Sequence, residues 1–412
     1  MFFDKLSDDE LFPKFRRLLA EAPPSQIEAE LLIRGAVSEM IEAAETFGLG
    51  GDLWERSFAL LLARDDNTLG RVCEMSEAPG GSIRAIAAAE LSRLHIVLAG
   101  ARKFADNEFD CIRRYTPNAR AALNKTPAIL AAEALADKTA AAGGGGEIAD
   151  ALIEFYRFHG SGIFAAARAF RWSKGEGLEA IESPDGQTLA SLIGYDDQKR
   201  ELLSNTRSFL GGHPANNALL FGDSGTGKSS SVKALLNEPG FAELGLRMIE
   251  VDKDNIADIP RLMDVIKPRA YRFIIFIDDV SFETFETGYK QLKAAIEGML
   301  SGRPDNVVIY ATSNRRNIVR EVWSDRKAAS DDVHGADSAQ EKLSLADRFG
   351  LVLWYGSAGK QLYLDMIKYY ARCYGADMPD EEIEAAAMRY VIGRGGFTGR
   401  MAKQCAAKIM AV

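Results

Sequence analysis

The first 142 residues carry apolar side chains at the spacing of amphipathic helices. Ile27, Leu31, Val37 and Ile41 recur at the period of one helical face. Three segments also fit a capping box, in which a polar side chain and a glutamate three positions later satisfy the free amides at a helix start; they begin at Ser7, Ser25 and Asp52. The pattern predicts an all-helical domain over residues 1–142.

Residues 143–188 differ from this pattern. Four consecutive glycines, 143–146, are typical of a flexible linker. Whether they form a free hinge or a packed turn is open at this stage. Two further helical stretches are expected over 147–158 and 162–172.

From residue 189 onward, short apolar runs alternate with helical segments. The runs are too short for helices and are apolar throughout, as in strands that are buried on both faces; they cover residues 218–221, 246–251, 273–277, 307–312 and 351–354. This alternation predicts an α/β domain with a parallel five-stranded sheet over 189–356. Residues 357–412 again have a helical pattern, which predicts a helical C-terminal domain.

Composition and charge narrow the class of protein. The 412 residues are 47% hydrophobic and 26% charged, as in a globular protein with a full core, and their number suggests roughly two to three domains. No apolar run approaches the roughly 20 residues of a membrane span. A net charge of −9 argues against a general nucleic-acid coat. Four scattered cysteines, four scattered histidines and an acidic start to the chain predict a cytoplasmic protein without a metal cluster.

One glycine-rich segment carries the strongest chemical signal. It reads GDSGTGKS and matches the phosphate-binding pattern G-x-x-x-x-G-K-[ST], with an apolar strand before it and a helix after it. Glycines let successive amides point at phosphate, the lysine reaches the terminal phosphates and the hydroxyl ligates Mg²⁺. The predicted ATP-binding residues are Gly222, Asp223, Ser224, Gly225, Thr226, Gly227, Lys228, Ser229 and Ser230.

A second carboxylate motif completes this site. The apolar run 273–277 ends in Asp278 and Asp279, at the sheet edge where such folds bind ligands. We expect Asp278 and Ser229 to hold Mg²⁺, and Asp279 to polarise the attacking water.

With both motifs, the chain from residue 189 to its end resembles the AAA+ ATPases. The resemblance implies that Asn314 is the sensor-1 residue that orients water and that Arg348 is an arginine finger. It also implies that Arg400 is the sensor-2 residue of a C-terminal lid. Adenine would lie against Ile193, Gly194 and Tyr195. The segments 214–217, 312–316 and 341–345 are more similar still to an uncharacterised bacterial family of AAA+ proteins with helical N-terminal regions.

Several of these roles have competing interpretations. Arg315 and Arg316 directly follow the sensor-1 strand and are rival finger candidates. Asn314 could instead cap the next helix. Arg400 lies in the first turn of a predicted helix, where the dipole disfavours a cation.

Two features depart from the AAA+ pattern. Most members have glutamate where this chain has Asp279, whose carboxylate is one methylene shorter, so we expect slow water activation. Protein-threading members carry an aromatic pore loop, but residues 252–258 contain neither an aromatic residue nor glycine, which disfavours an unfoldase. The polar stretch 324–340 predicts a surface loop of unknown role.

The leading hypothesis is a Mg-ATP hydrolase that remodels or positions a macromolecular partner, acting as a homo-oligomer with Arg348 supplied in trans. An alternative is an ATP-dependent switch or scaffold with little turnover. A DNA-associated loader is a third hypothesis, supported by only two basic doublets, 113–114 and 315–316. The helical N-terminal domain is expected to recognise an unknown protein client.

Overall fold

The structure of the protein is a computed structural model. This structure describes residues 3, 11–20, 25–76, 79–123, 125–181, 184–280, 304–314, 348–392 and 396–410, without the side chains of 104–108. The chain forms two compact units. The first comprises Met1–Arg168 with Ala180–Ser183, and the second comprises Ala169–Glu179 with Pro184–Val412.

The first unit is helical, as the apolar spacing predicts. Its elements are α1 (Pro13–Ala20), α2 (Gln26–Phe47), α3 (Leu53–Arg64), α4 (Thr68–Met75), α5 (Gly81–Phe109), η1 (Asp110–Arg114), α6 (Ala119–Leu123), α7 (Pro127–Ala141), α8 (Gly145–His159) and α9 (Ile163–Ala166). Helix α3 is buried on nearly every side, with Trp54 and Phe58 at most 1% exposed. A helix that is apolar all round belongs at the centre of a core, and α3 has that position here.

Side-chain caps set several helix starts. Ser25 accepts a hydrogen bond from the Glu28 amide, and Asp52 accepts one from the Trp54 amide, so both residues cap their helices as predicted. The Glu55 side chain pairs with Arg102 at 2.9 Å, so the second half of the box predicted at Asp52 is replaced by an ion pair. The box at Ser7 lies outside the described residues.

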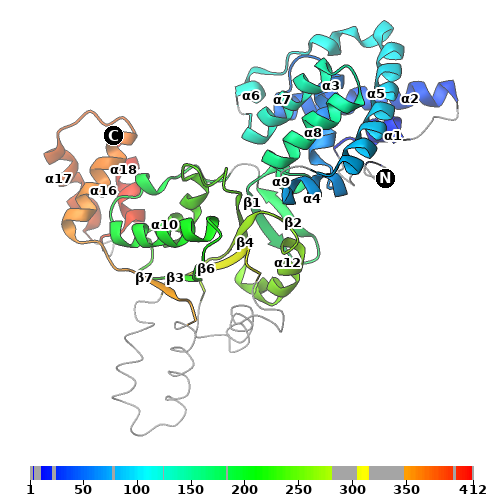
Figure 1. Ribbon diagram of the computed structural model, residues 1–412. Coiled ribbons are helices and arrows are strands. Elements are labelled where there is room, and N and C mark those ends of the chain that lie inside the picture. The colour runs from blue at the N-terminus through cyan, green and yellow to red at the C-terminus, as the bar shows by residue number, and fades with distance from the viewer. Residues whose placement is uncertain are drawn as a thin grey trace. The chain divides into compact units, whose positions relative to one another are not determined.

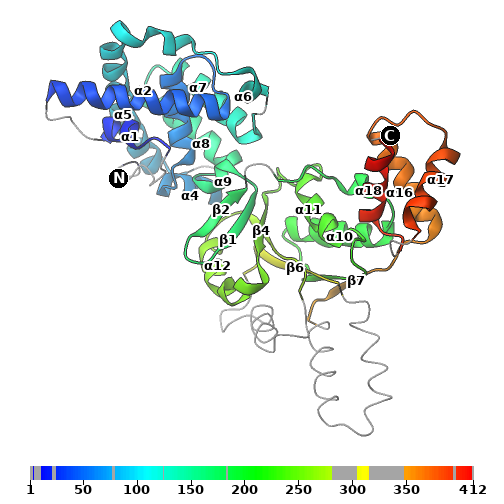
Figure 2. The same cartoon turned by 180° about the vertical axis from the view of Figure 1, so that it is seen from behind.

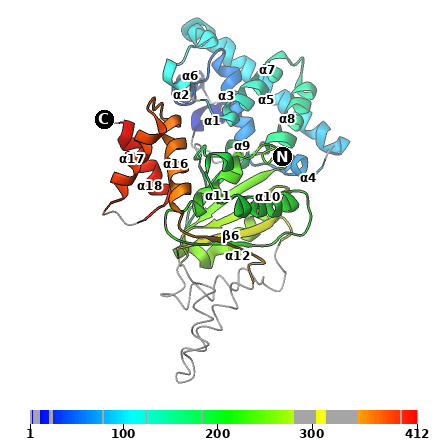
Figure 3. The ribbon, with the colours of Figure 1, turned by 90° about the vertical axis from the view of Figure 1, so that its left-hand side faces the viewer.

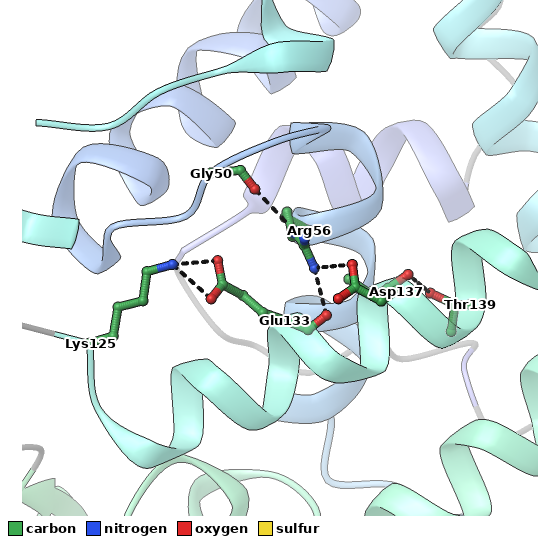
Figure 4. A network of polar contacts seen from close by, with 7 residues as sticks. Gly50, Arg56, Lys125, Glu133, Asp137 and Thr139 are labelled. Carbon is green, nitrogen blue, oxygen red and sulfur yellow. Dashed lines mark hydrogen bonds and ion pairs between the residues drawn. The ribbon is translucent and has the colours of Figure 1, made fainter. Parts of the chain in front are cut away.

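One partly buried arginine ties α3 to α7. The Arg56 guanidinium donates to Gly50 O (3.1 Å) and Glu133 O (2.6 Å) and pairs with Asp137 (2.8 Å). Lys125 binds the Glu133 carboxylate at 2.7 Å (Figure 4). These contacts hold both helices in register around polar groups that burial would otherwise leave unsatisfied.

The four glycines 143–146 lie at the start of α8. Gly145 is packed tightly against α5, because a Cβ at this position would stand 2.1 Å from Ser92 Oγ and 2.2 Å from Ala88 O. Helix α8 buries Ile148, Leu152 and Tyr156 in the helical core. Gly145 is therefore fixed by packing at the start of a helix, and the boundary predicted at residue 142 lies inside the first unit.

The second unit contains the predicted α/β domain. Its elements are β1 (Ala169–Ser173), β2 (Gly177–Ile181), η2 (Leu189–Ser191), α10 (Asp196–Leu210), β3 (Ala218–Gly222), α11 (Lys228–Ala234), η3 (Leu235–Asn237), β4 (Leu246–Val251), η4 (Lys253–Asp258), α12 (Ile259–Ile266), β5 (Arg272–Ile277), β6 (Val307–Ser313), β7 (Leu351–Tyr355), α16 (Lys360–Cys373), α17 (Asp380–Val391) and α18 (Gly399–Met410).

The sheet confirms the five predicted strands and adds two. Its order is β2-β1-β4-β5-β6-β3-β7, and β1, β4, β5, β6, β3 and β7 run parallel. The helix predicted over 162–172 is wrong: only Ile163–Ala166 is helical, and Phe170 and Trp172 lie in strand β1. Pairing with β4 buries both aromatic side chains, and this long-range contact overrides the local helical pattern.

The order of strands brings distant segments together. Strand β6 lies between β5 and β3, although β3 precedes β5 in the sequence. The chain moves in opposite directions along the sheet from β3 to β4 and from β4 to β5. Because such crossovers are right-handed, α11 and α12 must cover opposite faces of the sheet, as Figure 3 shows. The ends of β3, β5 and β6 then meet at one edge.

The three C-terminal helices, α16, α17 and α18, form a small bundle that we refer to as the lid (Figures 1 and 2). Its core includes Tyr363, Ile367, Ile383 and Cys405, each at most 1% exposed. Among the described helices of the whole chain, none is long and apolar enough to cross a membrane.

Candidate functional site

A cavity of about 350 Å³ opens where the ends of β3, β5 and β6 meet the lid. Its wall is built by six stretches of the second unit that are separate in the sequence. The lining residues are Gln187, residues 192–195, Lys199, residues 225–231, Asp278, Asp279, Asn314, Met366, Tyr370, Gly399, Arg400 and Lys403. Most of the predicted site residues are among them.

The glycine-rich loop (residues 222–229, the P-loop) needs glycine for steric reasons. Gly222 has a φ of 137°, and a Cβ on it would stand 2.0 Å from Tyr355 O. Gly227, just before α11, has a φ of 98°. Both angles lie where residues with a side chain are strained, so the loop can take this path only with these glycines.

Lys228 is buried, and its ammonium group meets carbonyl oxygens. Nζ donates to Asp223 O (2.6 Å) and to Gly222 O (3.1 Å). Burial lowers the pKa of Lys228 to about 8, although the charges of Asp223, Asp279 and Asp278 oppose this shift. A buried ammonium beside a polar cavity is suited to an anion, which would replace the weaker carbonyl contacts.

Ser229 and Asp278 meet at the same point of the wall. The Ser229 hydroxyl donates to Asp278 Oδ1 at 2.5 Å, and the Thr312 hydroxyl donates to the same oxygen at 2.5 Å. Thr312 comes from the neighbouring strand β6 and also accepts a hydrogen bond from the Asp279 amide (2.9 Å). This threonine orients both aspartates. Its role was not predicted, because only the order of strands places it beside them.

Asp279 and Asn314 are in direct contact. Asn314 Nδ2 donates to Asp279 Oδ1 at 2.6 Å. Asp279 has a φ of 53°, in the left-handed region that aspartate and asparagine tolerate better than most residues. The polar end of Asn314 is thus held against the carboxylate that the sequence proposes for water activation.

The lid contributes to the other side of the cavity. The Arg400 amide, at the start of α18, donates to Gly225 O at 3.2 Å. The charge of Arg400 adds slightly to the lowering of the Lys228 pKa. Lys403, one turn further along α18, and Met366 and Tyr370 of α16 also line the wall. The sequence did not predict these three residues; only the helical spacing from Arg400 could have suggested Lys403.

Residues 192–195, which we call the base-side loop after the role predicted for them, also line the cavity. Gly194 has a φ of 87°, and Tyr195 has a φ of 56°. Lys199 Nζ donates to Leu192 O at 2.7 Å and ties this loop to α10. Burial, together with the nearby Asp223 charge, raises the pKa of Tyr195 to about 12, so its hydroxyl stays protonated.

Four predicted residues lie away from the cavity wall, the first of them Gly222 at the end of β3. The Asp223 side chain accepts a hydrogen bond from the Ser357 hydroxyl, and Ser224 is exposed. Arg348 precedes β7, which begins opposite the start of β3 and therefore at the sheet edge remote from the P-loop. The rival finger candidates Arg315 and Arg316 and the loop 324–340 lie outside the described residues.

The oxygen atoms that face the cavity fit Mg²⁺ better than a metal ion that is held by protein ligands alone. Within the described part of the chain, no group of three or more His, Cys, Asp or Glu residues could hold a metal ion. One hydroxyl and one carboxylate, Ser229 and Asp278, present oxygen atoms to the cavity. Mg²⁺ is usually bound by one or two carboxylates together with water and substrate phosphates.

Comparisons with known proteins find a matching protein family and similar solved structures. A family described as "Protein of unknown function (DUF815)" matches residues 165–412, more than half of the chain. No curated protein matches the sequence. Among solved structures, the RuvB Holliday junction branch migration motor of Thermotoga maritima is similar, with 17% identity and a TM-score of 0.38. The match covers 54% of this chain and 64% of RuvB, less than two thirds of its length. The FIGL-1 AAA domain in complex with ADP has 15% identity and a TM-score of 0.38, over 56% of this chain and 77% of that domain.

Proposed function

Because this chain belongs to the DUF815 family, whose function is unknown, its activity has to be argued from the site, and we propose that it is an AAA+-type ATPase. It binds Mg-ATP in the cavity and hydrolyses it. One observation carries the proposal: Lys228, Ser229, Asp278, Asp279 and Asn314 come from three separate segments and converge on one cavity wall.

The proposed roles follow from the contacts. Lys228 exchanges its carbonyl partners for the terminal phosphates, and the P-loop amides bind the remaining phosphate oxygens. Ser229 and Asp278 hold Mg²⁺, which when bound neutralises charge on the phosphates. Asp279 accepts a proton from the attacking water, and Asn314 keeps its carboxylate in position.

The two remaining sides of the cavity bind the rest of the nucleotide. Ile193, Gly194 and Tyr195 contact adenine from the base-side loop. Arg400, carried by the lid, adds positive charge near the phosphates. This charge is favourable only when an anion is present, because Arg400 otherwise faces Lys228.

Arg348 acts on a neighbouring copy of the chain. Its position at the sheet edge remote from its own P-loop supports a role in trans. Hydrolysis then requires a homo-oligomer, in which each copy completes the site of the next.

The energy of hydrolysis is used on a macromolecular partner bound by the helical unit. Ile27 and Leu31 of α2, one turn apart, are 73% and 64% exposed, which supports a contact with protein rather than with solvent alone. A nucleic-acid partner is less favoured, since Arg113 of the doublet 113–114 lies 3.9 Å from Asp110 and is partly neutralised.

An ATP-dependent switch with little turnover is the second candidate. Asp279 favours it, because its carboxylate is short and one of its oxygens is already bonded to Asn314. In this case, binding alone would change the lid and the partner surface.

The test is ATP turnover per mole of protein over a dilution series, with binding of Mg-ATP measured separately. The matched variant is Asp279→Asn, because asparagine also tolerates the left-handed backbone. We expect turnover to rise with concentration and to fall about 100-fold or more in Asp279→Asn, as for loss of a general base, with little change in binding. Lys228→Ala serves as the blank, because it is expected to lack both Mg-ATP binding and turnover.

Binding without turnover at any concentration would favour the switch. Neither binding nor turnover would overturn the proposal altogether.

A further inference from the structure

The chain passes from the sheet to the lid through a short connection. Strand β7 ends at Tyr355 and α16 begins at Lys360, and we call residues 356–359 the hinge. Any rotation of the lid relative to the sheet must change backbone angles here. The contacts that the hinge makes with the core therefore help to set the lid position, together with the bond from the Arg400 amide to Gly225 O.

The P-loop holds the hinge through one residue, Asp223. Its amide donates to Tyr355 O at 3.0 Å, and its carboxylate accepts a hydrogen bond from the Ser357 hydroxyl. Gly222 lies so close to Tyr355 O that a Cβ would not fit. The first two residues of the P-loop and the residues around the end of β7 are thus one tightly packed unit.

The base-side loop holds the hinge from the other side. The Tyr195 hydroxyl donates to Gly356 O at 2.6 Å, and its ring lies 4.8 Å from that of Tyr355. Ile193 and Tyr195 also pack against the core of the lid. Tyr195 has left-handed backbone angles, which are unfavourable for a large side chain and persist only where surrounding contacts enforce them.

Asp223 is also the residue that Lys228 contacts. Lys228 Nζ donates to the Asp223 carbonyl at 2.6 Å, while the Asp223 side chain holds Ser357. An anion in the cavity competes with this carbonyl for the ammonium group. When Lys228 leaves this carbonyl, Asp223 loses one of its hydrogen bonds. The change therefore acts on the same residue that holds the hinge.

We infer that Asp223 and Tyr195 are positioning residues that hold the hinge from both loops of the cavity and set the lid according to its occupancy. The inference rests on the proposed nucleotide site. It assigns Asp223 to the hinge rather than to the nucleotide, and it gives the Tyr195 hydroxyl a role besides contact with the base.

The lid position can be followed with two fluorophores. Cys373 at the end of α16 is exposed, as is Cys111 in the helical unit, whereas Cys73 and Cys405 are buried. The reference protein is the full chain with Cys111→Ser and with Glu201→Cys, an exposed position on α10. Energy transfer between residues 201 and 373 is measured with and without Mg-ATP, alongside the Kd for Mg-ATP.

We expect Mg-ATP to change the transfer efficiency of the reference protein. Asp223→Ala and Ser357→Ala each reduce this change by about half or more, and the double variant resembles either single variant because both remove one contact. Binding by Ser357→Ala stays within about threefold, since this side chain is uncharged and does not line the cavity. In steady-state kinetics kcat falls while KM changes little.

Conservative variants separate positioning from folding. Asp223→Asn can still accept from Ser357 and retains most of the change, whereas Tyr195→Phe keeps the ring contact, loses the bond to Gly356 and reduces the change. Gln361→Ala is the control, because it removes an exposed hydrogen bond within the first turn of α16.

The hinge role would be overturned if Mg-ATP changed the transfer efficiency of Ser357→Ala and Tyr195→Phe as much as that of the reference protein. This holds even if Asp223→Ala fails to fold. A reference protein that does not bind Mg-ATP would instead overturn the proposed function.

Discussion

Burial of Lys228 makes the proposed site sensitive to pH. Its pKa of about 8 means that the ammonium form needed for phosphate is lost as the pH rises through 8. We expect the Kd for Mg-ATP to rise up to about tenfold per pH unit above pH 8. Calorimetry in two buffers of different ionisation enthalpy should show proton uptake on binding near that pH.

The matched control for this prediction is Lys233→Met, on the same helix. Lys233 pairs with Glu250 at 3.0 Å outside the cavity, so the variant should keep the pH dependence, while Lys228→Met should lose it. A constant Kd between pH 7 and 9.5 in the unsubstituted protein would contradict the assignment.

The same lysine affects stability with a definite sign. Between pH 8 and its ordinary pKa of 10.5, the unfolded chain binds more protons at this residue than the folded chain does. The free energy of unfolding contributed by Lys228 therefore rises with pH over this interval. Below pH 8 the folded protein bears the full cost of a buried ammonium group.

At the scale of single elements, the cap of α4 depends on several hydrogen bonds made by one buried side chain. Asn67 is buried; its Oδ1 accepts from the Gly70 amide (2.8 Å), and its Nδ2 donates to Tyr156 OH (2.9 Å) and Asp65 (2.7 Å). We expect Asn67→Ala to lower the free energy of unfolding of this unit by about 2–4 kcal/mol. Amide hydrogen exchange in α3, α4 and α8 measures this quantity.

Ser25→Ala is the comparison, because Ser25 caps α2 at the surface through one hydrogen bond to Glu28. Its expected cost is about 0.5–1 kcal/mol. Equal effects of the two substitutions would show that the buried network around Asn67 contributes nothing beyond an ordinary cap.

Elements also show where local pattern and tertiary contact disagree. The dipeptide Thr116–Pro117 has the form of a helix start, but α6 begins at Ala119, and Asn118 supplies the cap to the Ala121 amide. Tyr115 pairs with Gly51 in an isolated bridge, which keeps the preceding backbone extended. The helix thus starts at Ala119, two residues after Pro117, beside a backbone contact with the distant Gly51.

At the scale of the whole molecule, the proposal predicts a site shared between copies. Arg348→Ala and Lys228→Ala should each lower turnover about 100-fold or more, as expected for loss of an arginine finger or the P-loop lysine. A mixture should recover activity, because one variant supplies intact sites and the other supplies the finger. The measurement is turnover of a 1:1 mixture against each variant alone.

The control mixes Arg348→Ala with the double variant Arg348→Ala/Lys228→Ala, which supplies neither part and should not recover. No recovery in the first mixture, once co-assembly is verified, would remove Arg348 from the active site.

The sequence by itself determined the local elements and the chemistry of the loop. Apolar spacing marked the helices and the five strands, because the side chains of one face recur at the period of the element. It did not fix exposure: Ile27 and Leu31 of α2 and Val352 and Trp354 of β7 are exposed. The glycines of the P-loop were recognisable, because their backbone angles exclude other residues. Asp278 and Asp279 were found because they follow an apolar strand, and Asn314 was found through the resemblance to the AAA+ ATPases.

Only the tertiary structure decided which of these residues meet. The place of β6 between β5 and β3 sets Thr312 against Asp278, and no local pattern contains that order. The left-handed backbone at Asp279 gives a reason for aspartate over the longer glutamate, which the sequence presented only as a departure. The sequence predicts that Asp223 belongs to the nucleotide site, whereas in the structure its side chain contacts Ser357 of the hinge. Such contacts join residues far apart in the chain, and only packing of the whole unit specifies them.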